Sequence, residues 1–214
     1  MAGSITDWAA SKIDPREGLS VVGRTPEDFL IMKYRDGLPF PVAILGVQDV
    51  ILVDHVQPLF SHVTKPQFVA NVPSKTLWSG DAISLIHASP AAFGTLGDVR
   101  RAASTGDVQS FRNKNWDFFE RGIRQHSKVH AVTRIYDEVF DARLLNGTTR
   151  RIALVDGYHV SAEDIRNARD RFGKFDIAVK KTSYGSITDA AEEAAASMGA
   201  NVVTFKGLLQ NLAR

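Results

Sequence analysis

The chain has 214 residues, of which 44% are hydrophobic and 23% are charged, and it contains no cysteine. This composition is typical of a globular protein and excludes a chain that is disordered throughout. The lack of cysteine excludes disulfide frameworks and cysteine-based metal sites or nucleophiles. The formal net charge of +2 is too small to indicate nucleic-acid binding by itself. No signal-peptide pattern and no apolar run of about 20 residues is visible, so we expect a cytoplasmic protein that does not enter a membrane.

The N-terminal part, residues 1–106, is predicted to be rich in antiparallel strands. Residues 29–34 and 40–45 are strand-like and flank a turn that contains Gly and Pro, and residues 50–53 continue as a third strand of a meander. Short helices are expected over residues 81–87 and 98–103. No internal repeat is visible in the sequence. A domain boundary is expected near residue 106, unless the chain forms one continuous domain.

The C-terminal part, residues 107–214, is predicted to be an α/β domain. The pair Asn146-Gly147 between two strand-like runs is the strongest short-range signal for a β-hairpin, because both residues of the simplest turn need positive φ. The strands are predicted over residues 132–145, 148–155, 175–180 and 201–205, and the helices between the last three over 161–172 and 188–199. Connections of about a dozen residues suit parallel crossovers. We therefore predict a mixed sheet, in which an antiparallel meander and hairpin are followed by a parallel βαβαβ part.

The edge at which the parallel strands end is the predicted binding site. In open α/β sheets ligands bind at this edge, and helix N-termini there attract anions. The residues predicted to bind a ligand are Lys181, Ser183, Tyr184 and Ser186. Lys180, the last residue of its strand, is expected to line the same anion site. Alternatively, Ser161 and Thr188 only cap their helices, and the lysines are solvated strand ends.

A second candidate site is a basic stripe on a helix predicted over residues 115–128. Arg121, Arg124 and Lys128 follow each other at helical spacing and share one face. Together with Arg112 they are predicted to bind the phosphate groups of nucleic acid. The alternative is a solvated face whose cations are favoured near the C-terminus of the helix.

The order of elements in the C-terminal part resembles a known superfamily. A helix with Glu120, a hairpin, a strand ending at Asp156, a strand ending at Lys180, a helix and a last strand look like the core of the restriction-endonuclease-like nucleases, which carry a PD-(D/E)xK motif. The resemblance covers residues 113–205. It implies Glu120, Asp156 and Lys180 as catalytic residues of a phosphodiester hydrolase, with Asp156 and Glu120 as ligands of Mg²⁺.

The chain departs from the motif of that superfamily. Ala178 stands two residues before Lys180, where the motif has an acid, and an extra helix interrupts the usual succession of strands. Asp176 does not replace the missing acid, because four strand residues place it about 13 Å from Lys180. Metal-dependent chemistry requires carboxylates in one coordination sphere. An active nuclease is therefore disfavoured by the residues themselves.

Three functions remain open from the sequence. The first is a nucleic-acid-acting or nucleic-acid-binding protein of restriction-endonuclease-like fold, either a divergent Mg²⁺-dependent nuclease or a catalytically inactive binder. The second is a nucleotide-binding or small-anion-binding α/β protein. The third is a structural or interaction protein without catalysis, with the N-terminal meander as its partner surface. A homo-oligomer is expected only because small α/β proteins often form one.

Overall fold

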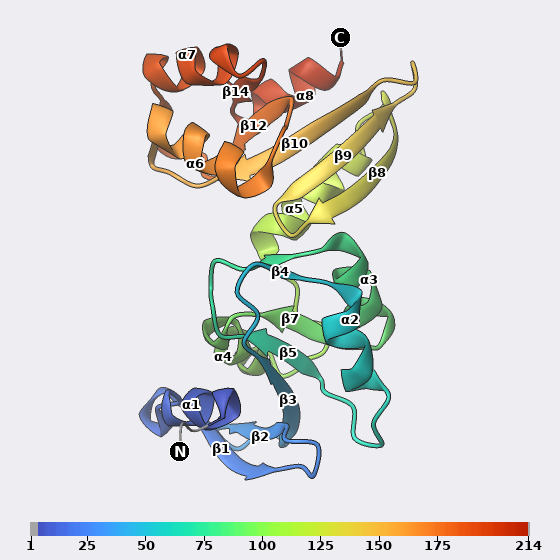
Figure 1. Cartoon of the computed structure of the whole chain (residues 1–214), viewed down its shortest axis with the longest axis vertical. Helices are drawn as coiled ribbons and strands as arrows, with labels where there is room; N and C mark the ends of the chain where they lie inside the picture. Colours follow the sequence, from blue (N-terminus) through green and yellow to red (C-terminus); the bar gives the residue numbers. More distant parts are fainter. Residues whose placement is uncertain (1–3, 214) are drawn as a thin grey trace. The chain divides into compact units, whose positions relative to one another are not determined.

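The computed structural model describes residues 4–213 and divides the chain into two compact units, unit 1 (Met1–Arg112) and unit 2 (Asn113–Arg214). Both are mixed α/β units in which antiparallel and parallel strands share one sheet (Figure 1). The boundary lies after residue 112 rather than near residue 106. In the described part of the chain, no helix has the length and apolar character that a membrane span requires.

Unit 1 is built on a five-stranded sheet with the order β1-β2-β3-β5-β7. Its strands are β1 (Leu19–Arg24), β2 (Leu30–Tyr34), β3 (Phe40–Leu45), β4 (Val50–Ile51), β5 (Phe68–Asn71), β6 (Leu77–Trp78) and β7 (Ala92–Gly94). Its helices are α1 (Ile5–Ser11), η1 (Pro15–Glu17), α2 (Val53–Val56), η2 (Gln57–Phe60), α3 (Gly80–Ala88) and α4 (Leu96–Ser104). β1, β2 and β3 are antiparallel neighbours, whereas β3, β5 and β7 run parallel.

The structure confirms part of the predicted meander and corrects the rest. β2 and β3 are the two predicted strands, but the third strand is β1 rather than residues 50–53. Of these, only Val50 and Ile51 form a strand, β4, which pairs in parallel with β6, and Val53 begins α2. The helices expected over residues 81–87 and 98–103 are present as α3 and α4. β5 and β7 were not predicted. They have four and three residues and are buried on both faces, so their sequence shows no alternation of polar and apolar positions.

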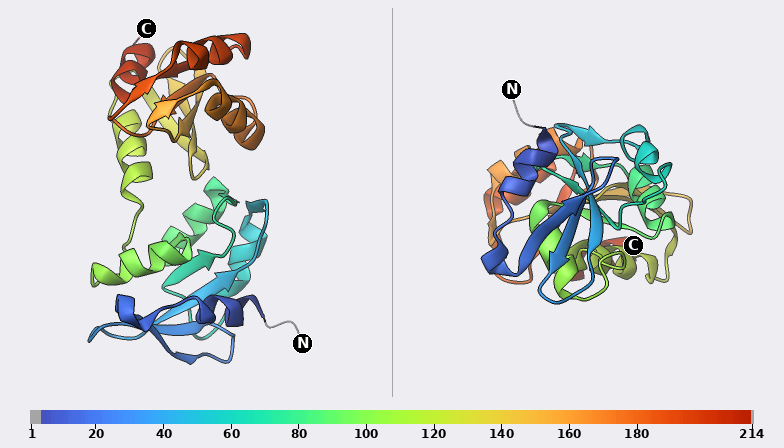
Figure 2. Two further views of the ribbon diagram at one scale, coloured as in Figure 1. Left: turned by 90° about the vertical axis from the view of Figure 1, so that its left-hand side faces the viewer. Right: turned by 90° about the horizontal axis from the view of Figure 1, so that it is seen from below.

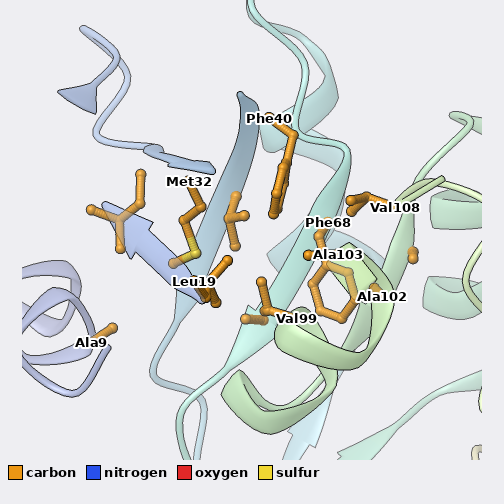
Figure 3. Close-up of a cluster of buried hydrophobic side chains, with 13 residues drawn as sticks. Ala9, Leu19, Met32, Phe40, Phe68, Val99, Ala102, Ala103 and Val108 are labelled. Atoms are coloured by element: carbon orange, nitrogen blue, oxygen red, sulfur yellow. The ribbon is translucent and has the colours of Figure 1, made fainter. Parts of the chain in front are cut away.

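The apolar core of unit 1 lies between one face of the sheet and the two helices α1 and α4 (Figure 3). Side chains from the strands meet side chains from both helices there, among them Leu19, Met32, Phe40 and Phe68 from the strands, Ala9 from α1, and Val99 and Ala102 from α4. A capping box fixes the start of α4, since Thr95 Oγ1 accepts from the Asp98 N–H and Asp98 accepts from the Thr95 N–H. The cap thereby sets where the apolar stripe of α4 begins.

Unit 2 is built on a second five-stranded sheet, with the order β8-β9-β10-β12-β14. Its strands are β8 (Val129–Tyr136), β9 (Val139–Leu144), β10 (Thr149–Val155), β11 (His159–Val160), β12 (Ile177–Lys180), β13 (Ser186–Ile187) and β14 (Asn201–Val203). Its helices are α5 (Lys114–Arg124), α6 (Ala162–Phe172), α7 (Asp189–Ser197) and α8 (Phe205–Leu212). β10, β12 and β14 are parallel, as predicted. α5 and α8 cover one face of the sheet, and α6 lies on the other (Figure 2).

The run predicted as one strand over residues 132–145 is two strands joined by a tight turn. β8 and β9 are antiparallel, and Asp137 and Glu138 form the connection between them. The turn places Glu138 beside the last residues of β10, where the Leu154 N–H donates to the Glu138 carbonyl oxygen at 2.9 Å. The predicted hairpin at Asn146-Gly147 is present. The Leu144 N–H donates to the Thr148 carbonyl oxygen, so three residues form the loop between them. The last of these, Gly147, has a positive φ of 85°, whereas Asn146 does not have a positive φ.

The two units share one topology. Each begins with a helix, continues as a three-stranded antiparallel meander, and adds two parallel strands through helical connections. Each also carries a pair of two-residue parallel strands at the same points of the chain, β4 with β6 and β11 with β13. In both units the first and last helices cover the same face of the sheet. The chain is therefore a structural duplication, although the sequence shows no repeat.

Equivalent elements lie at a nearly constant spacing along the chain. β1 and β8 begin at Leu19 and Val129, which are 110 positions apart. The caps of the last helices, Thr95 and Thr204, are 109 positions apart. The difference arises because the loop after the third strand of the meander is one residue shorter in unit 2. A second difference of one residue lies between the first helix and the first strand, because α1 and α5 begin 109 positions apart and β1 and β8 begin 110 apart.

Few of the equivalent residues are identical, because packing requires only an apolar side chain of suitable volume. Val99 of α4 corresponds to Leu208 of α8, and neither has any exposed surface. One identical polar pair also makes a similar contact in both units. Arg24 of β1 and Arg134 of β8 are equivalent, and each forms an ion pair with an acid on the first helix of its unit. The repeat is thus carried by topology and by a few contacts rather than by sequence identity.

Candidate functional site

The carboxyl ends of β10, β12 and β14 define one edge of the unit 2 sheet, here called the carboxyl edge. The loop after β10 runs over residues 156–158 and the loop after β12 over residues 181–185, and the short strands β11 and β13 join the two loops in parallel. Ser161 and Thr188 cap α6 and α7 at this edge, each accepting from a backbone N–H of its helix. The edge predicted from the sequence is therefore formed by the expected loops.

Lys180 fixes the loop that follows β12. Its residue surface is only 2% exposed, and its ammonium group donates to the carbonyl oxygens of Thr182, at 2.7 Å, and of Tyr184. A buried ammonium group is stable only when its donors are satisfied. Lys180 therefore ties the loop to the end of β12, and the structure does not place it at the surface of the edge, where an anion would bind.

Gly185 lets the two loops touch. Its φ is 77°, and a Cβ atom at this position would lie 1.8 Å from the carbonyl oxygen of Tyr158. The Ser186 N–H donates to the same carbonyl oxygen at 3.1 Å, and His159 Nδ1 lies 2.8 Å from Ser186 Oγ. Because no side chain separates the two backbones, the loops form one joined platform.

Two tyrosine rings project from this platform into solvent. Tyr158 is 65% exposed and Tyr184 is 74% exposed. The backbone of each is fixed, since the Tyr158 carbonyl accepts from Ser186 and the Tyr184 carbonyl accepts from Lys180. The ring of Tyr158 also meets the ring of His159 edge to face at 4.7 Å. Exposed aromatic side chains on a fixed backbone are typical of recognition surfaces.

An ion network lies behind the platform. Lys181 Nζ bonds to Glu138 and lies 2.5 Å from Asp156 Oδ2, while Arg171 Nη1 lies 3.0 Å from the second oxygen of Glu138. The Lys181 and Glu138 side chains are each 9% exposed, whereas that of Asp156 is 81% exposed. Burial lowers the pKa of Lys181, but the charges of Glu138 and Asp156 and their hydrogen bonds outweigh it, so the pKa lies above its ordinary value.

The sequence did not predict a role for Glu138. Lys180, which was expected to line the anion site, is bound by backbone carbonyls, whereas Lys181 is the partner of Asp156. The acids Asp137-Glu138 within an apolar run were the available signal for the turn that positions Glu138. The predicted ligand-binding residues Ser183 and Tyr184 lie in the loop after β12, and Ser186 begins β13 next to it. Ser183 is exposed.

A cavity of about 140 Å³ lies between this network and α6, lined among others by Glu138, Asp164 and Arg171. Pockets that bury a drug-sized ligand have volumes of about 300–1,000 Å³. The cavity is therefore too small for a nucleotide, and a ligand of that size has to bind on the outer surface of the edge.

The same edge of unit 1 is closed by neutral groups. Asn71 is equivalent to Lys180, since each ends the second parallel strand, and it is 1% exposed. Its side chain accepts from the Val47 N–H and donates to the carbonyl oxygens of Val47 and Pro73, each at 3.0 Å. Thr76 Oγ1 donates to the Val47 carbonyl oxygen at 2.7 Å. These bonds tie the two loops of unit 1 directly together.

Two residues that give the carboxyl edge of unit 2 its chemistry are replaced by residues of another type in unit 1. At the spacing of 109, Lys181 corresponds to Val72 and Tyr184 to Lys75. Unit 1 therefore lacks both the central cation of the ion network and the aromatic ring of the second loop. Two units of equal topology differ in this edge, which makes the edge of unit 2 the candidate functional site.

The predicted basic stripe is largely paired within its own helix. Arg121 lies 2.6 Å from Asp117, and Arg124 lies 2.7 Å from Glu120, both one helical turn away. Arg112 belongs to the end of unit 1 and donates to the backbone carbonyl oxygens of Gln109 and Phe111. Lys128 follows α5 and is exposed. Local pairing reduces the positive charge that this face offers to phosphates.

A groove of about 730 Å³ lies between α5 and α8 on the same face as the stripe. Phe118, which is 53% exposed, and Phe205 form its aromatic floor, with ring centroids 4.8 Å apart. Gly122 permits this contact, because a Cβ atom there would lie 2.4 Å from the Phe205 ring. The groove provides a second exposed aromatic surface, on the face of the sheet that α5 and α8 cover.

Glu120 does not join Asp156 in a metal site. Glu120 lies on α5 and pairs with Arg124 of the same helix and with Arg134 of β8. Asp156 follows β10, which is two strands away from β8 in the sheet. Burial raises the pKa of Glu120, but the charge of Arg134 and the charge and hydrogen bonds of Arg124 outweigh it, so the pKa lies below its ordinary value. Within residues 4–213, no three or more His, Asp or Glu side chains gather where they could hold a metal ion.

Comparison of the chain with protein-family models, with curated proteins and with solved structures gives no match. The geometry of the carboxyl edge and the contrast between the two units therefore carry the functional proposal.

Proposed function

We propose that unit 2 binds nucleic acid at its carboxyl edge through unpaired bases, and that it does so without cutting the strand. The observation that carries this proposal is the pair of exposed tyrosines, Tyr158 and Tyr184, on loops whose backbone is fixed. Every nucleobase stacks on such a ring whatever the sequence, and each stack contributes about 1–3 kcal/mol. Fixed backbones reduce the ordering cost of binding.

Positive charge for a phosphate group is available at the start of α8. This helix has no acid in its first turn and carries the exposed Lys206 there, next to the end of β14. Free N–H groups and the helix dipole favour an anion at such a position. α6 and α7 are less suitable, because their first turns contain acids. We therefore expect few phosphate contacts and a shallow dependence of affinity on salt.

The resemblance to restriction-endonuclease-like nucleases supports the class of ligand but not the cleavage. Unit 2 has a helix, antiparallel strands, a strand that leads to Asp156 and a parallel strand that ends at Lys180, in the expected order. The residues implied as catalytic have separate partners, since Glu120 pairs with arginines, Asp156 with Lys181, and Lys180 with backbone carbonyls. Phosphodiester hydrolysis of this kind needs acids in one coordination sphere.

Fluorescence anisotropy with labelled single-stranded and double-stranded oligonucleotides tests the proposal. We expect single strands to bind more tightly, because only unpaired bases expose their faces. Tyr158→Ala and Tyr184→Ala should each raise Kd about tenfold, which corresponds to the loss of about 1.4 kcal/mol. Phe118→Ala is the matched control, because it removes an exposed aromatic ring from the groove between α5 and α8.

The outcomes separate the alternatives. An unchanged Kd in both tyrosine variants, with weaker binding in Phe118→Ala or Arg124→Ala, would move the site to α5. Competition by a mononucleotide as effective as that by an oligonucleotide would favour the nucleotide-binding function. Strand cleavage with Mg²⁺ on a gel would contradict the non-catalytic part of the proposal, and no binding of any nucleic acid would overturn it.

A further inference from the structure

The carboxylates of the carboxyl edge that come nearest to a metal-binding arrangement are already bound by cations of the protein. Both oxygens of Glu138 are engaged, one by Lys181 and the other by Arg171 at 3.0 Å. Lys181 also lies 2.5 Å from Asp156. The ammonium group of Lys181 therefore lies between the two carboxylates, in the place that a metal ion takes when it bridges two acids.

A divalent metal ion does not fit among these residues as they stand. Mg²⁺ and Ca²⁺ require several free oxygen ligands, and neither oxygen of Glu138 is free. The four side chains carry two negative and two positive charges, so a further double positive charge meets repulsion from Lys181 and Arg171. The side chain of Lys181 is only 9% exposed, and if it moved into solvent, the buried carboxylate of Glu138 would lose this charged partner. The side chains around Asp156 therefore do not fit the Mg²⁺ that the nuclease resemblance implies.

We propose that the Lys181 ammonium group is a built-in cation that replaces a divalent metal ion between Glu138 and Asp156, so that this edge works without metal and gains a metal site when the ammonium group is removed. A lysine ammonium is a compact point charge with three donors, which suits two carboxylates at once. The contact is internal to unit 2, because it joins the turn before β9, the end of β10 and the end of β12.

The duplication shows that the lysine is not required by the fold. Val72 occupies the equivalent position in unit 1, where it packs against the apolar core, and the same arrangement of strands forms there. The replacement of Lys181 by an apolar side chain is therefore compatible with this topology. Lys181→Met keeps the length of the side chain, and Lys181→Ala opens space between the carboxylates.

Titration of the full-length protein with Mn²⁺, followed by calorimetry and by the melting temperature, tests the proposal. Wild-type protein should show no saturable binding up to millimolar Mn²⁺. Lys181→Ala should bind one Mn²⁺ with a Kd at least tenfold below the wild-type limit, and the metal should raise its melting temperature. Lys174→Ala, which removes an exposed lysine of the same unit, is the control and should behave as wild type.

The second mutation identifies the ligands. Glu138→Gln added to Lys181→Ala should abolish the gained binding, because a neutral amide replaces the carboxylate. If Lys181→Ala does not fold, Lys181→Ser, which also removes the charge and opens the space between the carboxylates, serves as the tested variant. Two results would overturn the proposal. One is saturable Mn²⁺ binding by the wild-type protein that is lost in Glu138→Gln, and the other is a folded Lys181 variant that binds Mn²⁺ no more tightly than the wild-type protein. Metal binding is read without nucleic acid, so this proposal and the proposed function fail independently.

Discussion

At the scale of single residues, buried contacts decide which of two neighbouring lysines holds a loop and which joins the ion network. Lys180 is enclosed and satisfied by carbonyl groups, and Lys181 is enclosed and satisfied by carboxylates. Successive residues of a strand point to opposite faces, so a shift of one position exchanges these roles. A sequence that reads Lys-Lys does not state which lysine meets which partner.

Lys180→Met should destabilise the protein by about 2 kcal/mol, because hydrogen bonds from a charged donor contribute about 1.5–3 kcal/mol. The expected loss arises from the Thr182 and Tyr184 carbonyl oxygens, which lose their donor. Denaturant unfolding measures it, with Lys174→Met as the control, which should change stability by less than about 0.5 kcal/mol. Equal stability of both variants would show that Lys180 does not hold the loop.

Gly185→Ala should be more harmful than Gly199→Ala. Both glycines have positive φ, but a Cβ atom at Gly185 would collide with the Tyr158 carbonyl, whereas nothing lies within 4 Å of one at Gly199. Gly199→Ala should cost about 1 kcal/mol from backbone conformation alone. Gly185→Ala should cost more and separate the two loops, which urea unfolding and the loss of oligonucleotide binding would report. Similar losses for the two variants would contradict the close approach.

At the scale of elements, the ion pair between α5 and β8 fixes the first helix of unit 2 on its sheet. Arg134 has 13% and Glu120 has 20% of its side chain exposed, so the pair is only partly screened by water. The equivalent arginine of unit 1, Arg24, pairs with Asp7 of α1. A contact between the first helix and the first strand is therefore repeated in both units.

Glu120→Gln should lower the free energy of unfolding by about 2 kcal/mol at pH 7, since a partly buried arginine loses its charged partner. The pKa of Glu120 is lower in the folded state than its ordinary value of 4.5. Its contribution to stability is therefore present above pH 4.5 and is lost as the pH falls through the folded pKa. Unfolding curves measured between pH 7 and pH 3 should converge for wild type and variant. A constant difference over that range would refute this linkage.

At the scale of the whole molecule, the duplication predicts that each unit folds by itself. Each five-stranded sheet and each apolar core is formed within one unit, and a chain of about 100 residues buries enough surface for independent folding. Residues 113–214 expressed alone should unfold cooperatively in calorimetry and retain single-strand binding. Residues 1–112 should fold but lack that binding. A disordered 113–214 fragment would show that the units depend on each other.

The sequence by itself determined the type of most elements. Helix caps, the hydrophobic runs of the strands and the Asn146-Gly147 turn are local signals, so the mixed α/β class and the parallel order of β10, β12 and β14 follow from neighbouring residues. Short strands such as β5 and β7 do not, because burial on both faces removes the alternation that marks a strand.

Only the tertiary structure decided which residues meet. Glu138 enters the candidate site because the β8–β9 turn lies against the end of β10, a contact between segments that are distant in sequence. The duplication was hidden for a related reason. Packing preserves volume and apolar character rather than identity, so Val99 and Leu208 occupy equivalent buried positions with different residues. Local chemistry thus sets the elements, and long-range packing sets both the repeat and the site.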